Sequence, residues 1–349
     1  MPASNTPRVS LRDIARSLGV SHATISKALR DDPEISEGRR REVRAAAKAM
    51  GYRPDPVLQQ LAAYRRSRHA SRVESCIAWL NDWPVPAAYH GFPQYASYWQ
   101  GARQAAERLG FRLEEFRLRP AAPTAGRLKR MLQARGIRGV LIPPHHADFH
   151  PGTMDWSGLS VVKIGFSVTN LSTHVVSSDQ YAGGRLAAEQ LLKAGHTRIG
   201  FVSTRSLELR SRGNFSAAFL HTRDRLIPEG DRIPALFLES DNLASRDAFL
   251  RWFRRFRPTA VLYSPAILTS WMNALDRQDD VPAVLCSISR LDAAAASGLN
   301  QFPEEVGEAA VEFLVSQLNA HQSGIPEHPR CVLIEPRWEG RIPEHPALG

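Results

Sequence analysis

The sequence has few cysteines, and their arrangement argues against a disulfide or metal framework. Only three occur in 349 residues, Cys76, Cys286 and Cys331, far apart and each in or beside an apolar run. Such spacing, without a CxxC pair, favours reduced thiols buried on strands over a disulfide or a metal site. The close histidine pair, His145 and His146, is adjacent in sequence and cannot share one helix face. We expect both histidines in a loop, and no metal or cofactor.

Long apolar runs and catalytic signatures are also missing. No stretch approaches the ~18 consecutive apolar residues that cross a bilayer, and the polar residues 1–9 lack the regions of an export signal. We therefore expect a cytoplasmic protein with no membrane partner. The sequence contains no GxSxG, phosphate-loop or HExxH motif, and no paired-carboxylate signature in a sensible context. An enzyme is not expected.

What the sequence does have is a concentrated positive charge. Its 45 Lys and Arg against 35 Asp and Glu give a net charge of +10. Residues 1–72 hold 15 basic and 7 acidic residues, a net charge of +8, and the other 277 residues carry only +2. The 43% hydrophobic content supports two or more cores. The basic fifth and the nearly neutral remainder therefore need separate explanations.

Three short helices are predicted in the basic segment. Ser10 can cap a helix over residues 11–18, and Ser21 can cap a second helix after a turn of about three residues that contains a glycine. This is the helix-turn-helix spacing. Ser36 can cap a third helix over residues 37–50, which is rich in Arg and Lys. Duplex DNA is the commonest partner of so basic a bundle, although any small helical bundle shows similar caps and stripes.

These residues resemble a known family. The segment from Val9 to Arg30, with Ile35-Ser-Glu37 and Gly51-Tyr-Arg-Pro54, is similar to the DNA-binding head of the LacI/GalR family of bacterial transcriptional regulators. The resemblance implies that three residues read bases in the major groove, namely His22, Ala23 and Lys27. It implies phosphate contacts at Ser21, Thr24, Ser26, Ser36 and Tyr52. We predict further phosphate contacts at Ser10, Leu11, Arg30, Arg39 and Gln59.

Residues 55–64 form a candidate hinge. Pro56 suits a first helical position, and Leu58 and Leu61 lie on one apolar edge of a segment of two or three turns. The pattern alone fits a packed linker helix equally well. The resemblance implies paired hinge helices in the minor groove, with Leu61 as the wedge between base steps and Leu58 beside it. We predict added phosphate contacts from the cluster that follows, Arg65, Arg66 and Arg68.

The remainder alternates short apolar runs with helical patterns, which is typical of parallel βαβ units. The expected strands are 76–80, 139–142, 161–164, 199–202, 260–263, 283–287 and 332–334. The expected helices are 99–109, 183–192 and 309–318. About 275 residues exceed one comfortable core, so two similar lobes are expected, with a ligand site beyond the carboxyl ends of the strands.

The resemblance continues through this region. Residues 179–188, residues 195–202 and Arg210-Ser-Arg-Gly213 are similar to the second-lobe entry and the effector-binding arginine motif of the same family. They imply a periplasmic-binding-protein-like domain that dimerises and binds a small molecule. Arg210 is the best effector residue, with a solvated surface arginine as the alternative. We add Tyr98, Trp99 and Ser287 as effector-binding candidates.

The sequence departs from sugar-binding members of the family at the expected site. Pro265-Ala266 replaces a common Asn-Asp, Cys286-Ser-Ile-Ser289 lacks an Asp, and Gly165 stands where some members have an acid. Carboxylates and amides accept hydrogen bonds from sugar hydroxyls, so these losses argue against an ordinary neutral hexose. Five nearby aromatic residues either stack on a ligand or pack at a lobe or dimer interface: Tyr89, Phe92, Tyr95, Tyr98 and Trp99.

The expected fold class is therefore multidomain: an all-α three-helix head with a hinge helix, then an α/β two-lobed periplasmic-binding-protein-like domain with parallel sheets. The expected boundaries are 1–54 for the head, 55–70 for the hinge and linker, and 71–349 for the effector and dimerisation domain. In that domain, the first lobe comprises 71–177 and a return segment near 305–330. The second comprises 178–304 and a C-terminal strand.

The expected function is a sequence-specific transcriptional regulator, a repressor that binds an inverted-repeat operator in double-stranded DNA as a homodimer at the nucleoid. Its expected effector is a small molecule, a sugar or sugar derivative. The alternative is an architectural or effector-independent DNA-binding protein whose cleft has lost ligand binding. A solute-binding protein for uptake would share the two lobes, but it would need an export signal and no basic head.

Overall fold

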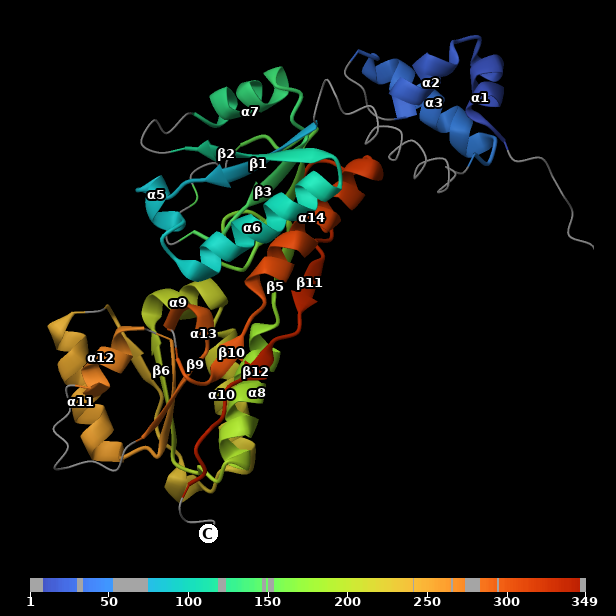
Figure 1. The fold of residues 1–349 in the computed structure, drawn as a ribbon. Coiled ribbons are helices and arrows are strands. Elements are labelled where there is room, and N and C mark those ends of the chain that lie inside the picture. The colour runs from blue at the N-terminus through green and yellow to red at the C-terminus, as the bar shows by residue number, and fades with distance from the viewer. Residues whose placement is uncertain are drawn as a thin grey trace, which may run out of the picture. The chain divides into compact units, whose positions relative to one another are not determined.

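The computed structural model describes residues 9–29, 34–52, 75–118, 124–145, 149, 154–240, 242–264, 266–273, 283–293 and 295–345 (Figure 1). Two compact units make up the chain. One comprises residues 1–74 with 319–322, and the other comprises residues 75–318 with 323–349.

The described part of the small unit contains three helices, α1 (Leu11–Leu18), α2 (His22–Leu29) and α3 (Glu37–Ala49). Ser10 and Asp13 form a reciprocal capping box at the start of α1, and Gly19 ends that helix at φ +65°, a left-handed conformation that favours glycine. The three helices enclose a core of fully or nearly fully buried side chains: Ile14, Ala15, Ile25, Ala28, Val43 and Ala47. The predicted helices and their caps are confirmed.

The large unit consists of two lobes, each built on a six-stranded sheet. The first sheet has the order β11-β5-β4-β3-β1-β2, with β1 (Ser75–Asn81), β2 (Phe111–Arg117), β3 (Gly139–Ile142), β4 (Ser160–Ile164), β5 (His174–Ser178) and β11 (Cys331–Ile334). Four helices accompany it: α5 (Pro86–Tyr89), α6 (Pro93–Arg108), α7 (Ala125–Ala134) and α14 (Pro303–Asn319). All its strand pairs are parallel, as predicted.

The second sheet repeats this order as β12-β10-β9-β8-β6-β7. Its strands are β6 (Ile199–Thr204), β7 (Leu236–Leu238), β8 (Ala260–Tyr263), β9 (Val284–Ser287), β10 (Gly298–Asn300) and β12 (Arg337–Glu339). Its helices are α8 (Gln180–Lys193), α9 (Arg205–Ser211), α10 (Asn214–Leu226), α11 (Leu243–Phe256), α12 (Ile267–Asn273) and α13 (Arg290–Ala293). The other described pairs of this sheet are parallel, as predicted, and β12 runs antiparallel to its neighbour, β10.

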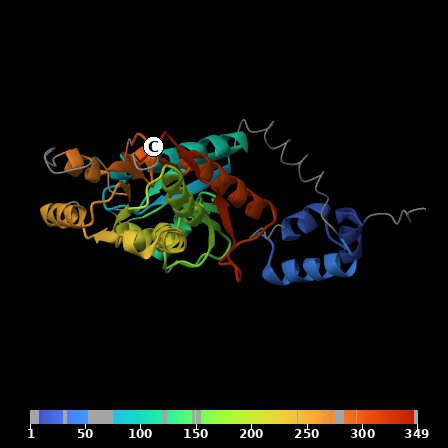
Figure 2. The ribbon, with the colours of Figure 1, turned by 90° about the horizontal axis from the view of Figure 1, so that it is seen from below.

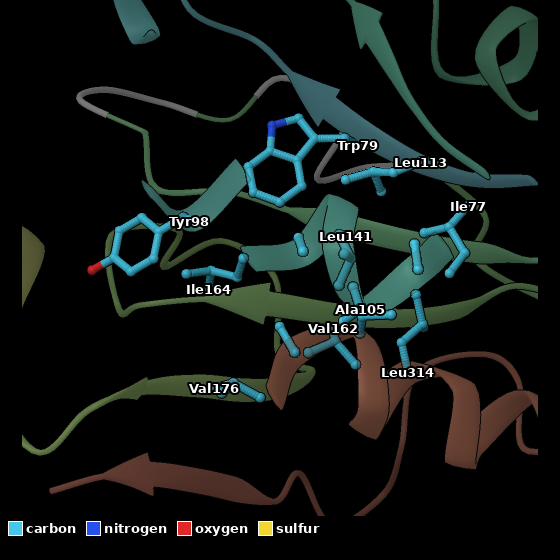
Figure 3. Close-up of a cluster of buried hydrophobic side chains, with 14 of the residues drawn as sticks. Ile77, Trp79, Tyr98, Ala105, Leu113, Leu141, Val162, Ile164, Val176 and Leu314 are labelled. Carbon is cyan, nitrogen blue, oxygen red and sulfur yellow. The ribbon is translucent and has the colours of Figure 1, made fainter. Parts of the chain in front are cut away.

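Alternate residues of each central strand face opposite layers of helices. In β1, Ile77 and Trp79 pack with residues of α6 and α14, whereas Ala78 and Leu80 pack with residues of α7. Figure 3 shows the first of these layers, where Trp79 lies near Leu113, and Leu314 of α14 lies near Ala105 and Val162. Burial on both faces explains why the central strands read as continuous apolar runs.

Three chain crossings join the lobes: β5 to α8, β10 to α14, and β11 to β12. Helices α6 and α14 lie side by side within the first lobe (Figures 1 and 2), and they meet through glycines. A Cβ atom at Gly101 would lie 1.9 Å from the Glu304 carbonyl oxygen, and one at Gly307 would lie 2.1 Å from that of Tyr98. The crossing therefore requires glycine at both positions.

The three cysteines are free and lie on strands, but the expectation that all are buried is correct only for Cys286. Cys76 is half-buried, and Cys331 is exposed because β11 is the edge strand of its sheet and alternates between exposed and half-buried residues. Among the described residues, no helix has the length and apolarity needed to span a membrane. The same residues contain no cluster of His, Cys, Asp and Glu that could hold a metal ion.

Candidate functional site

The first turn of α2 presents the predicted base-reading side chains. Ser21 lies just before the helix, and its Oγ accepts a hydrogen bond from the Thr24 N–H at 3.0 Å, which fixes the helix start. His22 and Ala23 are exposed, and Lys27, one turn later, is half-buried. The Lys27 ammonium pairs with Glu34, whose side chain is 70% exposed. Such an exposed pair is worth at most ~1 kcal/mol, so it is readily exchanged for a DNA contact.

The predicted phosphate-contacting residues cluster at helix starts. Ser10 and Ser36 cap α1 and α3, and the Ser36 Oγ accepts a 3.4 Å hydrogen bond from the Arg39 N–H. Helix N-termini carry unsatisfied N–H groups and a partial positive charge, both of which favour phosphate. Leu11, Ser26 and Tyr52 are half-buried on the same small unit. Four predicted DNA contacts lie outside the described residues, namely Arg30, Leu58, Gln59 and Leu61. The predicted basic cluster at residues 65–68 lies outside them as well.

In the large unit, Arg210 forms a contact between the lobes. It lies near the end of α9 in the second lobe and donates a hydrogen bond from Nη1 to the Tyr95 hydroxyl on α6 of the first lobe. Two residues along the chain, the Arg212 guanidinium lies 5.2 Å from the centre of the Phe166 ring. These contacts place the predicted effector arginine opposite a first-lobe aromatic residue.

The other predicted effector residues contact further neighbours inside the protein. Tyr98 is 6% exposed and its hydroxyl receives a 2.8 Å hydrogen bond from Gln94. Trp99 packs edge-on against Trp79 at 5.3 Å. Ser287 is fully buried, and its hydroxyl donates to the Ser289 carbonyl while accepting from the Ser289 N–H. Their roles in ligand binding stay predictions.

The five aromatic residues singled out in the sequence belong to one aromatic cluster of the first lobe. Tyr89 is fully buried, stacks on Tyr95 at 5.2 Å and meets Trp83 edge-on at 5.6 Å. Burial raises the pKa of the Tyr89 phenol well above its ordinary value, which keeps the phenol neutral. Packing therefore accounts for Tyr89, whereas Phe92 remains 43% exposed.

Sequence reasoning missed a polar group at the carboxyl ends of β1 and β3. Asn81 and Asp82 follow the apolar part of β1 and are 0% and 4% exposed. The Asp82 N–H donates to Nε2 of His145 at 2.9 Å, and Asn81 donates to Glu115 at 2.7 Å. Burial opposes ionisation of Glu115, but hydrogen bonds from Asn81, Arg117 and His90 outweigh it and lower the carboxyl pKa. The rule that ligands bind beyond strand carboxyl ends could have identified these residues from the sequence.

A cavity of about 550 Å³ lies where α6, α13 and the start of α14 meet. Gln94, Ser289 and Gln301 form a hydrogen-bonded group on its wall. Three carboxylates also line it, from Glu304, Glu305 and Glu339, and Glu339 pairs with Arg290. None of the four predicted effector residues lines this cavity.

The comparisons with known proteins follow the same division of the chain. The family described as "Bacterial regulatory proteins, lacI family" matches residues 10–55, and the "Periplasmic binding protein-like domain" matches residues 188–341. The predicted resemblance is thus confirmed: the chain has a LacI-type helix-turn-helix domain and a periplasmic-binding-protein-like domain, and its homologues are of the LacI/GalR family. The helix-turn-helix head and the two-sheet, parallel α/β domain are the predicted fold class.

Relatives of this chain are named as regulators rather than enzymes. The HTH-type transcriptional regulator reg1 of Streptomyces lividans is 29% identical over 54% of the chain and 52% of its own length. MalR of Streptomyces coelicolor is 30% identical over the same shares. The chain thus matches about half the length of these relatives. A solved "transcriptional regulator CelR-cellobiose complex" has a TM-score of 0.54 at 19% identity, covering 95% of this chain and 98% of that one, which supports the fold.

Proposed function

We propose that this chain is a sequence-specific DNA-binding regulator that represses transcription by binding an inverted-repeat operator as a homodimer, in the cytoplasm at the nucleoid. The observation that carries the proposal is the exposed first turn of α2 on a capped three-helix core within the basic part of the chain. A dimer presents two such helices to successive major grooves, so the operator repeats with the symmetry of the protein.

The proposed DNA contacts divide into positioning and reading groups. The hydroxyls and helix starts of the head bind phosphates and fix its register. Lys27 donates to guanine O6 or N7 as a point charge, and Ala23 offers only a methyl contact, for instance to thymine. Leu61 wedges into the minor groove between the paired hinges and kinks the duplex.

Comparing one natural inverted repeat with scrambled DNA at fixed salt tests this proposal. A regulator binds its operator at least ~10³-fold more tightly than scrambled DNA. Lys27→Ala should cost the operator complex about 1–3 kcal/mol and leave the scrambled complex nearly unchanged. Lys48→Ala, on the exposed face of α3, is the matched control. A ratio near one for the unmodified protein would refute the proposal and favour an architectural protein.

We further propose that the space between the lobes is the effector site, with Arg210, Tyr98, Trp99 and Ser287 as candidate contacts and a sugar or sugar derivative as ligand. The CelR structure named with cellobiose supports this for a fold of the same kind. The ligand acts by favouring one arrangement of the lobes over another, which changes hinge order and operator affinity.

A second candidate is a regulator that no longer needs an effector. The Arg210–Tyr95 contact favours it, because the protein's own hydroxyl already engages the predicted effector arginine. A thermal-shift screen of metabolites against the full chain separates the candidates, since a specific ligand stabilises by mass action. No response from any metabolite would favour the second candidate.

We also propose the boundaries 1–54 for the head, 55–70 for the hinge and linker, and 71–349 for the two-lobed domain. The strands that make up each sheet support this division. The first lobe ends near residue 177, and the chain returns to it at α14 and β11. Limited proteolysis with mass spectrometry tests them: cleavage should concentrate within 55–70, and cleavage first inside 178–304 would contradict them.

A further inference from the structure

Three cationic side chains lie near one another at the contact between the lobes. Arg210 touches Tyr95, Arg212 lies over Phe166, and Lys163 is 2% exposed at the end of β4, two residues before the loop that carries Phe166. Burial, together with the charge of Arg212, lowers the pKa of Lys163 to about 8. The Arg212 charge therefore acts on the buried ammonium group.

No carboxylate compensates this charge by an ion pair among the residues that the structure describes. The Lys163 ammonium donates to the carbonyls of Val168 and Leu171, at 2.8 and 2.5 Å. Arg210 donates to the Tyr95 hydroxyl and, from Nε, to the Ser206 carbonyl at 3.3 Å, and Arg212 lies over an aromatic face.

The acids close to these groups have other roles. Glu208 accepts a hydrogen bond from the Ser216 hydroxyl, and Asp179 caps α8 by accepting from the Ala182 N–H at 2.8 Å. Both contacts lie within the second lobe. Neither acid forms an ion pair with Arg210, Arg212 or Lys163 in the part of the chain that the structure describes, although Arg212 is itself exposed.

We infer that the interlobe contact takes a small anionic ligand, a carboxylate or a phosphate ester, whose oxygen replaces the Tyr95 hydroxyl on Arg210. This inference rests on the proposed effector site between the lobes. A guanidinium binds an oxyanion through two parallel, charge-assisted hydrogen bonds, which are roughly twice as strong as its bond to a neutral hydroxyl. Tyr95 is then an intramolecular competitor that occupies Arg210 until the anion arrives.

An anionic ligand also fits the absence of the acceptor side chains that sugar-binding members of the family use. Ser287 and Ser289 satisfy each other, and Gly165 offers no side chain. A neutral hexose, whose hydroxyls donate as well as accept, would find no carboxylate or amide acceptor at these three positions. An anion needs donors only, which Arg210 and Arg212 supply.

The test measures thermal shifts of the full chain with four probes at constant ionic strength: glucose, gluconate, glucose 6-phosphate and inorganic phosphate. At least one anion should raise the melting temperature at concentrations where glucose does not. The gluconate and phosphate arms distinguish a carboxylate from a phosphate ligand. Equal stabilisation by glucose, or none by any anion, would overturn the inference.

Two variants with opposite expected effects test the residues. Arg210→Gln should weaken anion binding roughly 10- to 100-fold, as expected for losing a hydrogen bond to a charged group. Tyr95→Phe, which removes only the competing hydroxyl, should tighten it by about fivefold. Arg255→Gln, at an exposed arginine of α11, is the matched control and should bind as the unmodified protein does. Unchanged binding by both Arg210→Gln and Tyr95→Phe would overturn the inference.

Operator binding without ligand is measured on the same proteins. If the operator remains preferred over scrambled DNA while no anion binds, only the ligand inference fails. If the operator preference is absent in the unmodified protein, the proposed function itself fails.

Discussion

His174 is a buried residue of β5 whose neutral form the first lobe requires. It is 7% exposed, and its Nδ1 accepts a 3.0 Å hydrogen bond from the Arg330 N–H, which joins β5 to the segment before β11. Burial and the Arg330 charge lower its pKa from the ordinary value of 6.5. The unfolded chain therefore binds a proton more readily than the folded one, and stability falls as the pH drops through 6.5 towards the folded-state pKa.

The prediction is that the free energy of unfolding of the first lobe is lower at pH 5.5 than at pH 7.5, and that His174→Asn reduces this difference. Denaturant unfolding at the two pH values measures it. His328→Asn is the control, because His328 is 91% exposed. His196, whose pKa burial also lowers, leaves some pH dependence in the second lobe. A variant at His174 with the full pH dependence would contradict the prediction.

At the scale of elements, the contact between α6 and α14 depends on the absence of a side chain. Gly101→Ala places a Cβ atom against the Glu304 backbone, which cannot move without shifting α14. We expect a loss of about 1–3 kcal/mol or more. Gly126→Ala, on the exposed part of α7 where a Cβ would have its nearest neighbour at 3.8 Å, should instead gain up to ~1 kcal/mol. Thermal unfolding of both variants measures the two changes in stability. Equal changes in the two variants would contradict the prediction.

The elements also differ in how visible they are in the sequence. The central strands β1, β3, β4, β6 and β8 appear as apolar runs because helices cover both their faces. The edge strand β2 was missed, because its charged residues form ion pairs along the sheet, such as Arg112 with Glu114 and Arg117 with Glu115. The alternation of apolar and polar residues in β2 is hard to recognise, because charged residues are placed along this edge of the sheet.

At the scale of the whole molecule, most of the net positive charge lies in residues 1–72, which we propose bind DNA, and little lies in the proposed effector domain. Changing Arg65, Arg66 and Arg68 to Ala should reduce the slope of log K against log salt by up to roughly 3, since each phosphate contact contributes ~0.9. The matched control changes three exposed arginines of α11, Arg251, Arg254 and Arg255, which should leave the slope unchanged. Operator titrations at several salt concentrations measure both, and an unchanged slope in the first variant would contradict the prediction.

The sequence by itself determined the caps, the helix-turn-helix spacing, the alternation of strands and helices and the location of the charge. These features depend on residues close together in the chain, where propensity, capping and periodicity act directly. Only the tertiary structure decided that Arg210 meets Tyr95, that Asp82 lies beside His145, and that β11 pairs with β5. Contacts between residues 63 to 156 positions apart depend on how the lobes fold and meet, which no local pattern records.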